Sequence, residues 1–206
     1  MAALLWMDER QKRLGTTTAF VQPGPRPAST VPSPPILPPR PVIVRAAGAR
    51  IPGRVSPAVK ARLEKLRGLG CDELDHERAG DEPIVTRLGR DRVLVALLCY
   101  RGASSGSETY FIVREHPSVT VERAVFRRPY QDLRSEHVRI PDFVLANPTK
   151  NLEEGTISHS FGTGSDGHCG EKGTWAWTGR AFEPLEIGTL VACGGASVRI
   201  PLYQTQ

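Results

Sequence analysis

Residues 92–100 of this chain read RVLVALLCY, an almost uninterrupted apolar run. A strand that is buried on both faces has this composition, whereas a strand with one face in water alternates apolar and polar residues. The run therefore predicts a central strand inside a packed sheet. Because the chain has 206 residues, of which 39% are hydrophobic, it is long enough and apolar enough to bury such a core.

Further strands are expected on the C-terminal side of this run, in segments rich in β-branched and aromatic residues. Turn residues separate the segments, and Thr178-Gly179 predicts a tight hairpin turn between two of them. Strands that follow one another with short turns favour an antiparallel meander over a parallel sheet. The expected strands cover residues 109–114, 119–126, 143–146, 156–161, 173–177, 181–187 and 199–203.

Two peripheral helices are expected before most of these strands. Residues 1–14 place apolar side chains at helical spacing, and Gly15 is a typical residue after a helix end. A second helix should begin at Ser56-Pro57, because serine is a favoured N-cap and proline suits the first helical position. The fold class is therefore mainly β with two peripheral helices (α+β), an antiparallel meander or sandwich-like sheet.

A proline-rich segment separates the two predicted helices. Half of the chain's 18 prolines fall in residues 23–41, which excludes a helix or a central strand there. The TTTAFV stretch just before it, residues 16–21, predicts a short strand. We therefore expect three units: residues 1–22 as a helix plus a short strand cut from a longer chain, residues 23–55 as a connector, and residues 56–206 as the β-rich domain.

The connector also contains the sequence PILPPR at residues 35–40. This is a PxxPxR pattern, of the kind that SH3 domains bind in the polyproline II conformation. Such matches are common in any proline-rich run, so an extended connector is the leading interpretation.

The positive charge of the chain does not by itself indicate a partner. The formal net charge is +5, but the basic residues are scattered and lie near acidic ones, whereas a nucleic-acid binder gathers them on one face or tail. No segment approaches the roughly 18 apolar residues that a membrane-spanning helix needs. We therefore expect no nucleic-acid partner and no membrane span.

Four cysteines stand at positions 71, 99, 169 and 193, without the CxxC spacing of zinc ribbons and thioredoxins. Their even number and their grouping in two sections predict two local disulfides, Cys71–Cys99 and Cys169–Cys193. By chain entropy each bridge would stabilise the fold by roughly 3 to 4 kcal/mol. Free buried thiols in a reducing compartment are the alternative.

A glycine-rich loop at residues 162–167 matches GxGxxG, but a strand follows it where dinucleotide binding needs a helix. We therefore expect no nucleotide cofactor. The loop carries Ser165 and Asp166, and His168 follows it directly; these three residues have the chemistry of a hydrolase-like site or a binding site. A metal site from His159, His168, Cys169 and Cys193 is not predicted, because the adjacent His168 and Cys169 would face opposite sides of a strand.

Trp175 and Trp177 lie two residues apart and should share one face of a strand. A tryptophan ring buries about 150 to 250 Å² when it is in a core, so we predict that at least one of the two is mostly buried. The alternative is an exposed aromatic pair that stacks on a glycan or contacts a partner protein.

Several segments together resemble a known family. These are LLWMDERQ at residues 4–11, RLGT at 13–16 and TAFV at 18–21, and later LVALLCYRG at 94–102 and TWAW at 174–177. They resemble the domain-of-unknown-function family 1176 of exported proteobacterial proteins. The resemblance covers nearly the whole chain but only the second half of the family's usual length, with no counterpart of its signal peptide. It implies export and paired cysteines, and it implies no activity.

We therefore expect a disulfide-stapled, non-catalytic protein of the bacterial cell envelope, periplasmic or secreted, with a binding or structural role and no cofactor. Its partner would be an envelope protein or a glycan. Two alternatives remain. One is a hydrolase-like enzyme that uses the glycine loop at residues 162–170, and the other is an inhibitor or glycan-binding module that uses Trp175 and Trp177.

Overall fold

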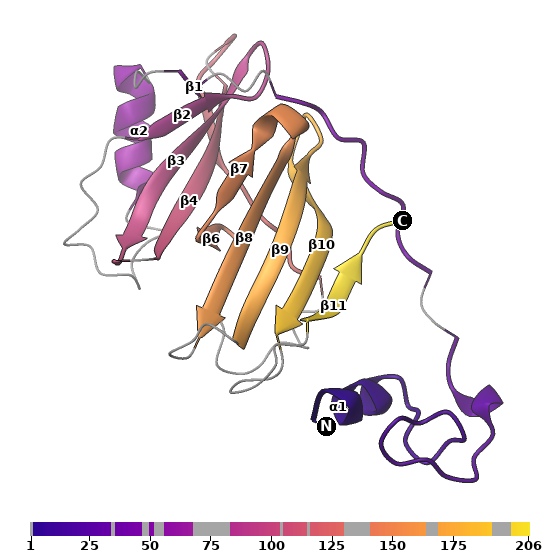
Figure 1. Ribbon diagram of the computed structural model, residues 1–206. Coiled ribbons are helices and arrows are strands. Elements are labelled where there is room, and N and C mark those ends of the chain that lie inside the picture. Colours follow the sequence, from indigo (N-terminus) through magenta and orange to yellow (C-terminus); the bar gives the residue numbers. More distant parts are fainter. Residues whose placement is uncertain are drawn as a thin grey trace.

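The computed structural model describes residues 2–33, 36–46, 50–51, 56–67, 83–103, 105–114, 116–129, 141–163, 169–190 and 199–206. Two antiparallel sheets and two α-helices make up most of this part of the chain (Figure 1). The predicted fold class, mainly β with antiparallel strands and few helices, is confirmed. In the described part, no helix is long and apolar enough to cross a membrane.

The first sheet is built around the apolar run that begins at Arg92. Its strands lie in the order β1 (Arg50–Ile51), β2 (Ile84–Arg87), β3 (Arg92–Arg101), β4 (Gly106–Arg114) and β5 (Thr120–Arg123), and β6 (Val144–Ala146) also pairs with β4. β3 therefore has a neighbour on each side, as its composition predicts. The short β1 lies within the segment that the sequence placed in the connector.

The second sheet is a five-stranded meander. Its strands lie in the order β11 (Arg199–Gln204), β10 (Phe182–Leu190), β9 (Cys169–Trp177), β8 (Thr156–Thr163) and β7 (Thr149–Asn151), with the 3₁₀ turn η4 (Leu152–Glu154) between β7 and β8. The hairpin predicted at Thr178-Gly179 joins β9 to β10. The turn spans four residues, because Trp177 pairs with Phe182 and the amide of Thr178 donates to the carbonyl of Ala181.

The two sheets pack against each other and share one core. Leu94, Ala96 and Tyr110 of the first sheet lie in it with Ile157 and Trp175 of the second. The segment after β5 also enters this core, since Phe126 is fully buried there. Its departure from the sheet explains why β5 ends at Arg123 and not at residue 126, where the sequence placed the end.

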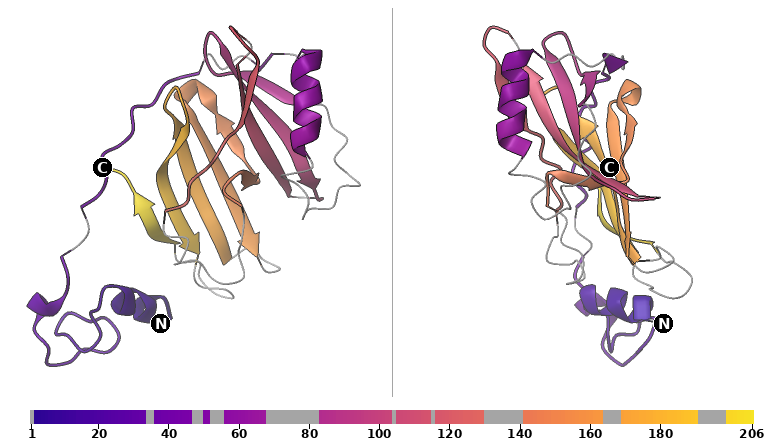
Figure 2. Two further views of the ribbon diagram at one scale, coloured as in Figure 1. Left: turned by 180° about the vertical axis from the view of Figure 1, so that it is seen from behind. Right: turned by 90° about the vertical axis from the view of Figure 1, so that its left-hand side faces the viewer.

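Helix α2 (Pro57–Arg67) covers the other face of the first sheet (Figure 2). Its buried Val59 and Leu63 pack with Val95 and Phe111 in a second apolar cluster. The helix begins as predicted, with the hydroxyl of Ser56 accepting from the amide of Val59. This helix explains why β3 is apolar on both faces: alternate residues meet the second sheet and α2.

The N-terminal segment differs from the prediction. Helix α1 (Ala2–Arg10) ends earlier than expected, and Lys12 takes a positive φ of 57°. The predicted strand at residues 16–21 is wrong: these residues form turns, with one isolated bridge from Thr16 to Arg26. The buried carboxylate of Asp8 accepts from the amides of Phe20 and Val21, so a side chain takes the backbone donors that a partner strand would use.

The described part of the proline-rich segment forms no α-helix and no strand. Residues 23–33 and 36–46 contain one 3₁₀ turn, η1 (Ala28–Thr30), and no strand. We call residues 36–46 the strap. The strap runs beside the second sheet and connects the sandwich to α1, which lies outside both sheets (Figure 1). The proposed division of the chain into three units stays a prediction.

The predicted cysteine pairings fall partly outside the described residues. Cys99 is fully buried in β3 and is in the disulfide-bonded state, and no cysteine of the described part is free. Cys71 and Cys193, the predicted partners, lie outside the described residues. The structure therefore does not show either predicted pairing, and both stay predictions.

Candidate functional site

Among the described residues, the strongest concentration of buried charge lies inside the sandwich, where strand alternation turns two polar residues of the second sheet inward. His159 on β8 and Glu171 on β9 meet there, with the imidazole Nε2 2.9 Å from the carboxylate Oε1. Arg128, in the segment after β5, donates from Nε to the same Oε1 at 2.7 Å. The side chains of Arg128 and His159 are 0% exposed and that of Glu171 is 5% exposed. We call these three residues the buried charged cluster.

Arg128 also joins two chain segments that precede and follow residues 130–140. Its guanidinium donates to the backbone carbonyls of Pro141 at 3.1 Å and Val144 at 3.0 Å, and it lies 3.3 Å from a carboxylate oxygen of Asp142. These bonds tie both segments to Glu171 on the second sheet. The planar, multiply donating guanidinium suits this work, which a lysine could not do with the same geometry.

Trp175 forms one wall of the cluster. The guanidinium carbon of Arg128 lies 5.4 Å from its ring centroid, and the imidazole of His159 lies 5.4 Å away on an edge-on contact. The indole N–H donates to the carbonyl of Arg127 at 2.9 Å. The aromatic wall keeps water from the charges, so the ion pair works in a medium of low dielectric.

The cluster has the chemistry of an internal brace. A catalytic group has to touch its substrate, and these side chains are closed off by the sandwich. Sequence reasoning considered His159 only as a metal candidate and did not find Arg128 or Glu171. A signal was present: Glu171 stands at an inward position of the strand that carries Trp175, and a buried acid needs a partner.

A second polar group bridges the two sheets near their margin. The hydroxyl of Tyr110 donates to Oε2 of Glu108 at 2.6 Å, and the ammonium of Lys150, on β7, donates to the same oxygen at 2.5 Å. Burial raises the pKa of the Tyr110 phenol well above its ordinary value of 10.0, and the charge and hydrogen bond of Glu108 raise it further. A phenol held neutral in this way is a donor to Glu108 and not a base.

Tyr110→Phe should change how the protein responds to alkaline pH. Above pH 10.0 the unfolded chain loses the phenol proton while the folded chain keeps it, so stability falls as the pH rises from 10.0 towards the higher folded-state pKa. At neutral pH the variant should have a free energy of unfolding about 1 kcal/mol lower than the parent, because it loses the hydrogen bond to Glu108. It should also show a shallower fall of stability above pH 10.0, measured by urea unfolding across pH 8 to 11.

Tyr100→Phe is the matched control, because the tyrosine at position 100 lies on the neighbouring strand β3 and is partly exposed. Its alkaline profile should follow that of the parent. If the Tyr110→Phe profile also followed the parent, Tyr110 would not be the group that titrates abnormally.

The structure does not test the site that the sequence predicted in the glycine-rich loop. Ser165, Asp166 and His168 lie outside the described residues. Cys169 pairs with Thr163 at one end of the sheet, whereas His159 pairs with Gly173 farther along the same strands. Among the residues that the structure describes, no group of three His, Cys, Asp or Glu side chains is placed to hold a metal ion.

Trp175 and Trp177 belong to the core. They are 0% and 1% exposed, so the expectation that at least one is mostly buried is confirmed for both. The alternative of an exposed pair that stacks on a glycan is wrong, because neither ring has a surface to offer. The rings turn inward because the first sheet and Phe126 provide apolar surface against which both are buried.

Gly173 makes room for the Trp175 ring. A β-carbon at this position would lie 2.4 Å from the nearest indole carbon. Gly173→Ala should therefore lower the free energy of unfolding by about 1 to 3 kcal/mol through overpacking. Gly89→Ala is the control, since a β-carbon there would meet nothing within 4 Å. Urea unfolding measures the stability of both variants. Equal stabilities would contradict the overpacking at position 173.

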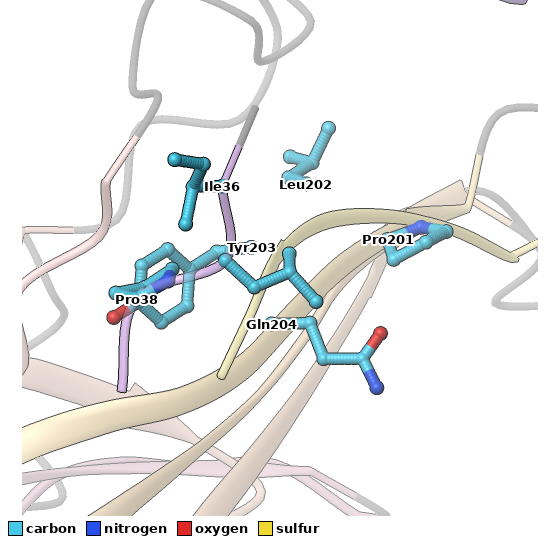
Figure 3. Close-up of a pocket in the computed structure, with 7 residues that line it drawn as sticks. Ile36, Pro38, Pro201, Leu202, Tyr203 and Gln204 are labelled. Atoms are coloured by element: carbon cyan, nitrogen blue, oxygen red, sulfur yellow. The ribbon is translucent and has the colours of Figure 1, made fainter. Parts of the chain in front are cut away.

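A small cavity of about 180 Å³ lies where the strap passes β11 (Figure 3). Pro38 of the strap and Tyr203 of β11 line the same cavity, and the wall is largely apolar. The amide and the side chain of Gln206 donate to the carbonyls of Pro38 and Leu37, both at 3.1 Å. The full lining is Ile36, Leu37, Pro38, Pro201, Leu202, Tyr203 and Gln204.

Comparisons with known proteins agree on a family without an assigned activity. The family described as "Protein of unknown function (DUF1176)" matches residues 1–201. The uncharacterized protein YpfG of Escherichia coli (strain K12) is 26% identical over 202 residues, which cover 93% of this chain and 53% of that protein. The chain thus spans about half the length of this curated relative. No solved structure matches significantly.

Proposed function

The chain belongs to the DUF1176 family of proteins of unknown function, and from that premise we propose that it is a non-catalytic protein of the bacterial cell envelope. Its role is binding or structural. The match over residues 1–201 agrees with the resemblance seen in the sequence, which also covers nearly the whole chain, but the family supplies no reaction to carry over.

The burial of the charged cluster carries the non-catalytic part of this proposal. In the described part, Arg128 and Glu171 form a buried ion pair. The other hydrogen bonds of Arg128 join segments of the same chain. Tyr110 and Lys150 likewise meet Glu108 across the two sheets. Buried polar contacts of this kind make the scaffold rigid, and a rigid scaffold suits a protein with a binding or structural role.

A reactivity test addresses the absence of catalysis. The purified chain should not be labelled by a fluorophosphonate probe that modifies activated serines. Labelling that disappears in Ser165→Ala and His168→Ala, but persists in the control Ser107→Ala, would overturn the proposal in favour of a hydrolase. Ser107 suits the control because it is buried in β4.

The envelope location is supported by the cysteines and by the resemblance to exported proteins. Cys99 in the disulfide-bonded state fits an oxidising compartment, where structural bridges persist. The protein, tagged and expressed from its own gene in its host, should be released with periplasmic markers by osmotic shock or recovered from the medium. Recovery with cytoplasmic markers would contradict the location.

Peptide mapping without reduction tests the pairings. We expect the disulfides Cys71–Cys99 and Cys169–Cys193. The first would involve β3 of the first sheet and the second would involve β9 of the second sheet. Alkylation of all four thiols in protein from the envelope fraction, or cross-pairing between the two sets, would rule them out.

A further inference from the structure

The two sheets bring a group of arginines together at one end of the sandwich. The β2–β3 turn and the β9–β10 turn lie at this end (Figure 1), and Arg92 at the start of β3 donates to the carbonyl of Gly179 in the second turn. The strap reaches the same place, because the amide of Val44 donates to the carbonyl of Trp177. We call this group the basic end, and its members are Arg45, Arg87, Arg90, Arg92, Arg114 and Arg180.

The strand register places two of these arginines directly opposite each other. Arg92 on β3 pairs with Arg114 on β4, and like charges at such a pair of positions destabilise a sheet. The Nε of Arg114 is also buried, and it has no hydrogen-bond partner in the described part of the chain. An anion bound at this position would reduce the repulsion and accept a hydrogen bond from this nitrogen.

The charge of the basic end is not neutralised by neighbouring carboxylates. Asp91 lies in the same turn as Arg90, but within the described part of the chain none of the six arginines makes an ion pair. Arg45, Arg87, Arg90 and Arg180 are exposed. Exposed cations without acidic partners produce a positive potential that attracts anions. Because the sequence spreads these residues over positions 45 to 180, only the fold gathers them.

Exposed apolar side chains accompany the arginines where the strap meets the basic end. Val42 is 81% exposed and Val44 is 37% exposed, and Arg45 follows them directly. A surface that lies on a lipid bilayer combines these two features, because basic residues meet the lipid phosphates and apolar side chains enter the headgroup region. Nucleic-acid surfaces instead add side chains that reach base edges or stack on bases, whereas the exposed apolar residues here are aliphatic.

We propose that the basic end docks on the surface of a lipid bilayer that contains anionic phospholipids. The arginines contact the lipid phosphates, and Val42 and Val44 enter the headgroup region. This attachment is reversible, because each basic residue contributes only a small part of the binding free energy and salt screens that contribution. It is therefore compatible with release of the protein when the envelope is opened. This inference rests on the binding role proposed above and names the partner surface.

The test is co-sedimentation of the full chain with vesicles of phosphatidylcholine and phosphatidylglycerol in equal amounts. The parent should bind these vesicles at least tenfold more tightly than vesicles of phosphatidylcholine alone, and salt should weaken the binding. Arg90→Glu combined with Arg180→Glu should lower the affinity at least tenfold, since each basic residue near an anionic surface contributes about fivefold. Lys12→Glu combined with Lys172→Glu is the control with the same change in net charge. Both lysines are exposed and lie outside the basic end, so the affinity should stay within about twofold of the parent.

A second pair of changes keeps the test decisive if the first pair lowers the unfolding midpoint. Arg45→Gln combined with Arg87→Gln removes two exposed charges from the strap and from β2, and it should also lower the affinity at least tenfold.

Three outcomes would overturn the proposal. A folded variant with changes at the basic end could bind the anionic vesicles as tightly as the parent. The lysine control could lose as much affinity as the arginine variants, which would mean that net charge alone drives the binding. The parent could bind a double-stranded DNA oligonucleotide more tightly than the vesicles at the same salt concentration, which would make a nucleic acid the partner. These measurements use purified protein, so their failure is distinguishable from a failure of the fractionation and serine-labelling tests above.

Discussion

Trp175→Ala should lower the free energy of unfolding by about 3 to 5 kcal/mol, the range for removing a large aromatic side chain from a packed core. The ring is 0% exposed and contacts Phe126 edge-on, with the centroids 5.5 Å apart. It also forms the wall of the buried charged cluster and binds the carbonyl of Arg127 through its indole N–H. The loss therefore combines a cavity, a hydrogen bond and the exposure of the charges to water.

Urea unfolding followed by far-ultraviolet circular dichroism measures this loss. Lys172→Ala is the control on the same strand, because Lys172 is exposed, and it should stay within about 0.5 kcal/mol of the parent. A Trp175→Ala variant as stable as the control would mean that the ring does not lie in the core.

Arg128→Met should have an effect of similar size, about 3 to 5 kcal/mol, because it leaves the carboxylate of Glu171 buried without the guanidinium. The two backbone carbonyls of Pro141 and Val144 lose a donor in the same step. The aliphatic part of methionine keeps much of the volume, so the change reports on charge and hydrogen bonding more than on packing.

Two further variants separate the ion pair from a general effect of mutation. Arg127→Met, at the exposed neighbouring position, should have nearly the same free energy of unfolding as the parent. Arg128→Met combined with Glu171→Met should be more stable than Arg128→Met alone by about 1 kcal/mol or more, since the two groups are in direct contact and the second change removes the unpaired charge. Glu171→Met alone completes the double-mutant cycle. If the changes in unfolding free energy of the two single variants added up to that of the double variant, Arg128 and Glu171 would not be coupled.

Much of the local structure could be read from the sequence. The apolar run at residues 92–100 predicted β3, because an unbroken series of apolar residues has to be covered on both faces. The Ser56-Pro57 pair predicted the start of α2, since capping depends on neighbouring residues alone. The β-branched residues at positions 16–21 predicted a strand that does not form. The carboxylate of Asp8 accepts hydrogen bonds from backbone amides that a strand would have used for pairing.

The candidate site was less accessible to such reasoning. Trp175 and Trp177 were placed on one face by strand alternation, but only the packing of the first sheet over them decided that both are buried. Glu171 and Arg128 are 43 residues apart in the chain. Nothing in their local sequence announces the pairing, which arises because the segment after β5 crosses between the sheets.

The sequence by itself determined the elements of this protein: the antiparallel strands, the second helix, the extended strap and the inward face of β9. These follow from the period of apolar residues, from capping and from the fixed φ of proline, all of which act within a few residues. Only the tertiary structure decided which apolar faces meet, that Arg128 braces Glu171 and His159, and that Gln206 fastens the strap. Long-range contacts depend on how two sheets stack, and that arrangement is set by the packing of the whole core rather than by any one segment.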